Sequence, residues 1–133
     1  MDVYDSPEAC SGALHPRARE GILLFNSGQY FQAHEALEEA WRQESAPIRD
    51  LYRGLLQAAV VYLHASRANY AGAVKVYDRC MRWLRGWPPV CRSVDVARLR
   101  ADLEALRGEI ERLGPKGLSA LDAAWLRPVA WVE

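Results

Sequence analysis

The chain has 133 residues, half of them apolar, which suffices for one hydrophobic core and leaves no room for a second. Its 17 basic and 17 acidic residues cancel, so no overall field draws the molecule to nucleic acid or to an anionic membrane. The acidic N-terminus lacks the features of a signal peptide and no window approaches a membrane span, so we expect a cytoplasmic protein without membrane contact.

Apolar residues recur with a period near 3.6 along the chain and alternating strand-like runs are absent, so the sequence predicts an all-α protein. Helices are expected over about 16–26, 29–44, 47–67 and 69–85, and Asn26-Ser27-Gly28, Ala46-Pro47 and Gly86-Trp87-Pro88-Pro89 separate or end them. The third helix is apolar around most of its circumference, which is typical of a central helix packed on several sides.

A fifth helix is expected to begin with Ser93 as its cap and Asp95 in its first turn, and to close at Gly114-Pro115. In the remaining tail we expect a short helix capped at Ser119, with Trp125 and Trp131 covering either the body or a second copy of the chain in a homodimer. The whole chain, 1–133, is thus expected to form a single helical domain with a core at 16–114, an N-terminal extension at 1–15 and a C-terminal tail at 115–133.

An internal repeat relates two parts of this layout with a shift of 40 residues, so that Gln29-Tyr30 aligns with Asn69-Tyr70 and Ala33 with Ala73. Two related helix hairpins follow, with a pattern that also occurs in tetratricopeptide-like repeats. Because there are only two copies, a compact antiparallel bundle of about five helices is favoured over an open solenoid.

The three cysteines, Cys10, Cys80 and Cys91, are odd in number and show no Cys-x-x-Cys spacing, which is typical of a cytosolic protein. Cys80 falls on the inward face of its helix, so we expect it to behave as a small apolar residue. Cys10 and Cys91 have no activating sequence neighbours, and no catalytic cysteine is expected.

The stretches FNSGQYFQAHEALEEAW and RGLLQAAVVYLHASRANYAGAV resemble a family called Domain of Unknown Function 309, small helical proteins of bacteria and archaea. The resemblance covers about Phe25 to Leu84 and weakens through the fifth helix. It rests on Asn26, Gly28, Tyr30, His34, Glu35, Leu37, Glu38 and Trp41 together with Gly54, Gln57, His64, Asn69 and Gly72-Ala73. It implies an all-helical bundle and, since the family has no established activity, no particular function.

Polar side chains border the buried faces of the second and third helices. His34 and Glu38 lie on one flank of the second helix, whereas Glu35 points away from it. Arg53, Gln57 and His64 share one flank of the third helix. An antiparallel pairing of the two helices brings Arg53 nearest Trp41 and Glu38, with His64 toward the far end.

Besides metal-free acid–base chemistry by the same side chains, two interpretations of this cluster remain open. In the first it is a buried hydrogen-bonded network in which Glu38 pairs with Arg53 and each histidine finds a partner. In the second, His34, Glu38 and His64 hold a divalent metal such as zinc, iron or manganese, supported by Glu35 or Arg53, and the protein is a hydrolase. The segment His34-Glu35-x-x-Glu38 departs from the His-Glu-x-x-His zinc motif, because a carboxylate replaces the second imidazole.

A basic face offers a third hypothesis. Lys75, Arg79 and Arg82 repeat at i, i+4 and i+7 on the outer side of the fourth helix, where they are suited to hold an acidic protein partner, another anion or a nucleic-acid backbone. Nucleic acid is disfavoured, because no aromatic residues interleave with the charges. With the function unknown, the reading we favour is a protein-interaction or scaffold module with an unidentified protein partner, ahead of the metal enzyme and the anion-binding surface.

Overall fold

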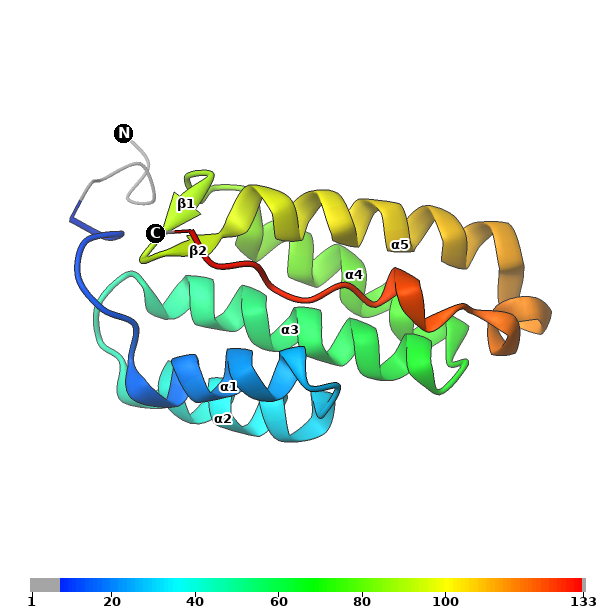
Figure 1. Ribbon diagram of the computed structural model, residues 1–133, viewed down its shortest axis with the longest axis horizontal. Helices are drawn as coiled ribbons and strands as arrows, with labels where there is room; N and C mark the ends of the chain where they lie inside the picture. Colours follow the sequence, from blue (N-terminus) through cyan, green and yellow to red (C-terminus); the bar gives the residue numbers. More distant parts are fainter. Residues whose placement is uncertain (1–7, 133) are drawn as a thin grey trace.

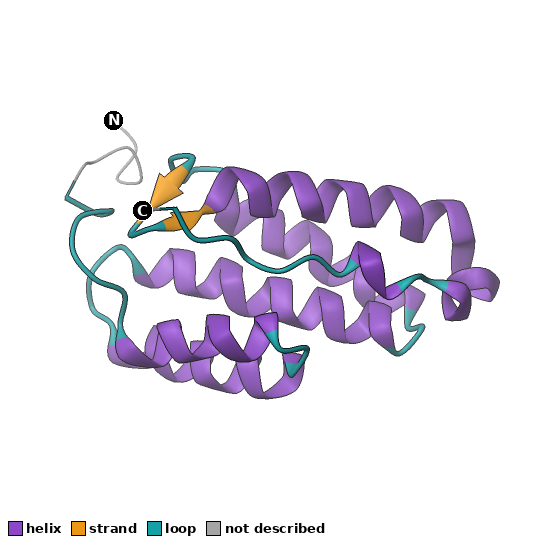
Figure 2. Ribbon diagram, viewed as in Figure 1, coloured by secondary structure: helices purple, strands orange, loops and turns teal. Residues whose placement is uncertain are grey.

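Five α-helices make up most of the computed structural model, which describes residues 8–132 (Figures 1 and 2). They are α1 (Pro16–Asn26), α2 (Tyr30–Gln43), α3 (Arg49–Ser66), α4 (Tyr70–Leu84) and α5 (Val96–Gly117). The predicted all-α class and the antiparallel bundle are confirmed, and the ends of the first four helices lie within two residues of their expected positions. No helix among residues 8–132 is long and apolar enough to cross a membrane.

Helix α3 lies at the centre of the bundle, as its apolar circumference predicts. In Figure 1, α1 and α2 form one side, α3 lies in the middle, and α4 and α5 form the opposite side. Helices α2 and α4, which carry the 40-residue repeat, both pack against α3. The turn between α1 and α2 uses Gly28 with a φ of 82°, a left-handed conformation that glycine adopts without steric cost. The central helix therefore positions side chains against neighbours on both flanks.

A small hairpin precedes α5 and was not expected. Strands β1 (Val90–Cys91) and β2 (Val94–Asp95) pair antiparallel. Their turn residues, Arg92 and Ser93, have φ values of 48° and 70°, which only a well-supported turn imposes on side-chain-bearing residues. Ser93 is thus a turn residue, and Asp95 caps α5 instead by accepting a hydrogen bond from the Arg98 backbone N–H at 2.9 Å. Strands of two residues are too short to produce a visible alternation.

The expectation of cysteines typical of a reducing compartment is not met, because Cys10 and Cys91 form a disulfide across 81 positions of sequence. Spacing could not reveal this pair, since the fold brings together two cysteines that lie 81 positions apart in the sequence. Arg92 strengthens the same junction, donating hydrogen bonds to the carbonyls of Ala9 at 3.1 Å and Ala13 at 2.9 Å. Cys80 is buried and free, as predicted.

Beyond α5 the tail folds back over the body. Within the span of α5, Gly114 has a φ of 71° and a ψ of 177°, so the regular helix is interrupted at the predicted place and only a short helical stretch follows up to Gly117. In place of the expected helix capped at Ser119, two short 3₁₀ turns follow, η2 (Leu118–Ala120) and η3 (Ala123–Trp125). Asn26 then exchanges two hydrogen bonds with the Val129 backbone, at 2.9 and 2.8 Å. The tail therefore covers its own bundle, one of the two expected alternatives.

Candidate functional site

Arg53 on α3 is held by aromatic rings instead of by an acidic residue. Its guanidinium carbon lies 5.1 Å from the ring centre of Trp41 on α2 and 4.7 Å from that of Trp83 on α4. Such cation–π contacts engage the flat faces of the guanidinium and leave the N–H groups free in its plane. Within residues 8–132, Arg53 has no hydrogen-bonding or ion-pair partner for those groups. It is thus a positioned cation with unused donors.

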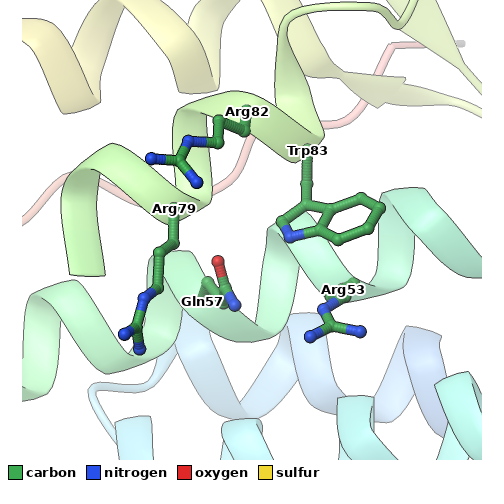
Figure 3. Close-up of a pocket in the computed structure, with 5 residues that line it drawn as sticks. All are labelled: Arg53, Gln57, Arg79, Arg82 and Trp83. Carbon is green, nitrogen blue, oxygen red and sulfur yellow. The ribbon is translucent and has the colours of Figure 1, made fainter. Parts of the chain in front are cut away.

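A cavity of about 470 Å³ adjoins this guanidinium between α3 and α4 (Figure 3). Its lining consists of Arg53, Gln57, Arg79, Arg82 and Trp83. Arg79 and Arg82 are exposed, and neither makes an ion pair with an acidic residue in the described part of the chain. Three cationic groups without counter-charges therefore border one cavity in a protein whose formal net charge is zero.

Gln57 contributes an unsatisfied acceptor to the same cavity. Its side-chain Oε1 is buried and has no hydrogen-bond partner in residues 8–132. In Figure 3 the Gln57 amide lies between the side chains of Arg79 and Arg53. A buried acceptor without a donor costs free energy, so this oxygen favours a ligand or a water that can donate.

A second cavity of about 200 Å³ adjoins the first, and Arg53 and Gln57 line both. The remaining lining of the second cavity is His34, Glu38, Trp41 and Leu56. We call these two cavities together the Arg53 groove; they share Arg53 and Gln57, and their lining residues come from α2, α3 and α4. The sequence-predicted neighbours His34, Glu38, Arg53 and Gln57 are thus brought together.

The partners within this group differ from those expected. Glu38 pairs with Arg42, one turn further along α2, and lies 3.4 Å from His34 through Oε2 and Nε2. It forms no ion pair with Arg53, whose guanidinium is drawn to the indole rings. The expected Glu38–Arg53 bond is therefore replaced by a bond within one helix, where an i, i+4 spacing already places opposite charges together.

His64 does not join His34 and Glu38. It follows Arg53 by 11 residues, roughly 16 Å along the helix axis, and its Nδ1 lies 3.0 Å from Asn69 Nδ2 beside the turn into α4. Glu35 is exposed and borders a separate surface hollow with Arg17 and Arg42. Among residues 8–132 no three His, Cys, Asp or Glu side chains form a group that could hold a metal ion, so the predicted ligand set His34, Glu38 and His64 is not assembled.

The three basic residues predicted to form one face of α4 lie in two different environments. Arg79 and Arg82 line the Arg53 groove, while Lys75, one turn earlier on the same helix, is exposed and lies outside its lining. Trp83 is a further site residue, which belongs to neither the polar cluster nor the basic face described from the sequence. The available signal was its i, i+4 spacing from Arg79, which places an aromatic ring beside a cation on one helix face.

Cys80, which follows the groove residue Arg79 on α4, does not supply a reactive group. Its buried thiol donates a hydrogen bond to the Gly54 carbonyl at 3.3 Å, and burial raises the pKa of this thiol well above its usual range. Cys80 therefore stays protonated and unreactive at neutral pH. The groove offers cations, aromatic surface and an amide acceptor.

Comparison with known proteins finds a similarity to one family over part of the chain. The model of a family described as "Domain of unknown function (DUF309)" matches residues 18–76. The resemblance to DUF309 is confirmed over this stretch. Arg53 and Gln57 lie inside the DUF309 match, whereas the α4 side of the groove, with Arg79, Arg82 and Trp83, lies just beyond it.

Two curated relatives have no described function. An "Uncharacterized protein" of Aquifex aeolicus (strain VF5) is 29% identical over 101 residues, covering 75% of this chain and 30% of the relative. The "Uncharacterized protein YpuF" of Bacillus subtilis (strain 168) is 39% identical over 75 residues, covering 54% of this chain and 43% of the relative. The chain thus matches less than half the length of each of these relatives.

Proposed function

We propose that this chain is a small binding module whose Arg53 groove holds an anionic ligand. The observation that carries the proposal is the Arg53 guanidinium, which is stacked against Trp41 and Trp83 while its N–H donors have no acceptor within residues 8–132. A planar guanidinium fork matches carboxylate and phosphate oxygens, and a fixed fork loses little side-chain entropy when an anion binds.

The neighbouring charges support the same function. Arg79, Arg82 and Arg53 carry like charges around one cavity, and a bound anion would reduce the repulsion among them. The larger cavity is lined by arginine, glutamine and tryptophan side chains, which suit recognition. This proposal combines the binding-module class expected from the sequence with the anion-binding face predicted on α4.

The test measures thermal stabilisation and binding heat with citrate and pyrophosphate, at an ionic strength held constant with sodium chloride. We expect both anions to stabilise the wild type, because they bind only the folded protein. Arg53→Gln should abolish the response, and Arg53→Lys should recover part of it, since lysine keeps the charge without the fork. Lys75→Gln is the charge-matched control on α4 and should respond as the wild type does. An equal response to sodium chloride alone, or an undiminished response in Arg53→Gln, contradicts the proposal.

We propose further that the protein works in the cytoplasm, supported by the absence of a membrane-crossing helix among residues 8–132. The Cys10–Cys91 disulfide would meet a reducing thiol pool there, so the bond would be open for much of the time. Alkylating intact cells before lysis, followed by mass spectrometry of the two cysteines, measures their state. Free thiols at both positions support a cytoplasmic location, and a fully formed bond argues for an oxidising compartment.

A further inference from the structure

We infer that the occupant of the Arg53 groove is an acidic peptide segment of a partner protein. This inference rests on the proposed anion-binding function and deepens it by naming the chemistry of the ligand. Three features carry it: the separation of the cations, the unpaired acceptor of Gln57, and the apolar wall of the smaller cavity.

The three guanidinium groups do not converge on one point. In Figure 3 the side chains of Arg79 and Arg82 leave α4 in different directions, and the Arg53 guanidinium lies apart from both, beneath Trp83. A single phosphate is best held by donors that converge on its oxygens. Cations spread along a groove suit several anions carried on one chain, as in a segment with repeated glutamate or aspartate residues.

Gln57 adds a requirement that separates peptides from other polyanions. Its buried Oε1 needs a hydrogen-bond donor. A peptide presents backbone N–H groups between its acidic side chains, so it can pair with Gln57 and the arginines together. The phosphodiester group of a nucleic acid and a fully deprotonated anion such as sulfate carry no such donor at neutral pH.

The adjoining cavity also favours a peptide. Trp41 and Leu56 supply an apolar wall there, in a space of about 200 Å³ next to the cationic part of the groove. An apolar side chain near the acidic ones would fill this space. Stacking of nucleic-acid bases on the groove side is hindered, because Arg53 lies over the rings of both Trp41 and Trp83.

The experiment uses fluorescence anisotropy with a labelled peptide of Glu-Glu-Leu repeats and its glutamine-for-glutamate isostere. We expect the acidic peptide to bind at least about tenfold more tightly than the isostere, and the Arg79→Gln, Arg82→Gln double variant to weaken it by about tenfold. Lys75→Gln should leave the affinity within about twofold of wild type, because a single exposed charge outside the groove contributes little.

The variant Gln57→Leu best separates an effect on peptide binding from an effect on stability. Removing an acceptor that has no partner in the free protein should leave the thermal midpoint unchanged or raise it. The same change should weaken the acidic peptide by about fivefold or more and leave sulfate binding unaffected, because the peptide can donate to this oxygen and sulfate cannot. Retained stability with selective loss of peptide binding is the expected pattern.

The outcomes separate this inference from the proposal beneath it. If pyrophosphate binds through Arg53 but the acidic peptide binds no better than its isostere, the peptide inference is overturned and the anion-binding function stands. Tighter, arginine-dependent binding of single-stranded DNA than of the peptide likewise overturns it in favour of a nucleic-acid ligand. Failure of every anion to bind overturns both.

Discussion

An arginine at position 53 suits its surroundings better than a lysine would, for a physical reason. A lysine ammonium would bind more water and could not spread over two indole rings, whereas a guanidinium is weakly hydrated on its faces. Arg53 lies within 5.1 Å of the ring centres of both Trp41 and Trp83, so its orientation is set before any ligand arrives. The residue therefore combines a structural contact with α2 and α4 and an unused set of donors toward the groove.

The contribution of a second single residue, Tyr62, can be tested through the pH dependence of stability. Its hydroxyl donates a 2.8 Å hydrogen bond to the Arg127 carbonyl, and burial raises its pKa above the ordinary value of 10.0. Because the folded-state pKa is the higher one, the stabilisation is fully present below about pH 10 and is lost as the pH rises above that value. Tyr62→Phe should cost about 1 kcal/mol in the free energy of unfolding at pH 7 and should flatten the alkaline loss of stability. Denaturant unfolding at pH 7 and pH 11 measures both effects.

Tyr30→Phe is the matched control for Tyr62. Burial also raises the Tyr30 pKa, but its hydroxyl has no hydrogen-bond partner among residues 8–132. This variant should therefore flatten the alkaline decline without the loss at pH 7. A Tyr62→Phe protein as stable as the wild type at pH 7, or with the same alkaline decline, would show that the hydroxyl contributes nothing to holding the tail.

At the level of the elements, Gly54 determines how closely α3 and α4 approach at the groove. A Cβ placed on Gly54 would lie 2.6 Å from Leu84 Cδ2 and 3.4 Å from Trp83 Cβ. The missing side chain lets α4 pack close to α3, and it thereby brings Trp83 within reach of Arg53. The distance between these helices is therefore a property on which both the core and the groove depend.

Gly54→Ala should destabilise the protein by roughly 1–3 kcal/mol, because the added methyl group overpacks the α3–α4 contact. Gly108→Ala is the control: it lies exposed on α5 with nothing within 4 Å of the added Cβ, and it should stabilise the helix by about 0.5–1 kcal/mol. Urea unfolding of both variants measures the difference. Equal effects of the two changes would mean that α3 and α4 do not meet at Gly54.

The helices were predictable because each one presents an apolar face with a clear period and ends at glycine, proline or a capping residue. The hairpin at Val90–Asp95 escaped prediction for the opposite reason: its strands are short, and its turn uses Arg92 and Ser93 in place of the glycine or asparagine that signals such turns. The Cys10–Cys91 disulfide could not be predicted either, because Cys91 lies on a strand of that hairpin.

At the scale of the whole molecule, the candidate site was only partly predictable. Helix periodicity placed Arg53 beside Trp41 correctly, since both lie near the turn that joins their helices. Arg79 and Arg82 lie beside Arg53 and Gln57 because of how α4 is rotated about its axis relative to α3. A single sequence does not specify that rotation. His64 does not meet the other expected ligands because it follows Gln57, which lines a cavity with His34, by seven residues. That spacing corresponds to about 10 Å along α3.

The hairpin also determines how the molecule would carry a mechanical load. On one side the disulfide, whenever it is closed, fixes Cys10 to β1, and on the other Val132 donates a 2.7 Å hydrogen bond to the Ser93 carbonyl. Both ends of the described chain are therefore fastened to the same corner of the bundle. A pull applied to the two ends would first peel the terminal segment from the hairpin, and the helices would bear tension only afterwards. Anything attached at either end would share one tether point.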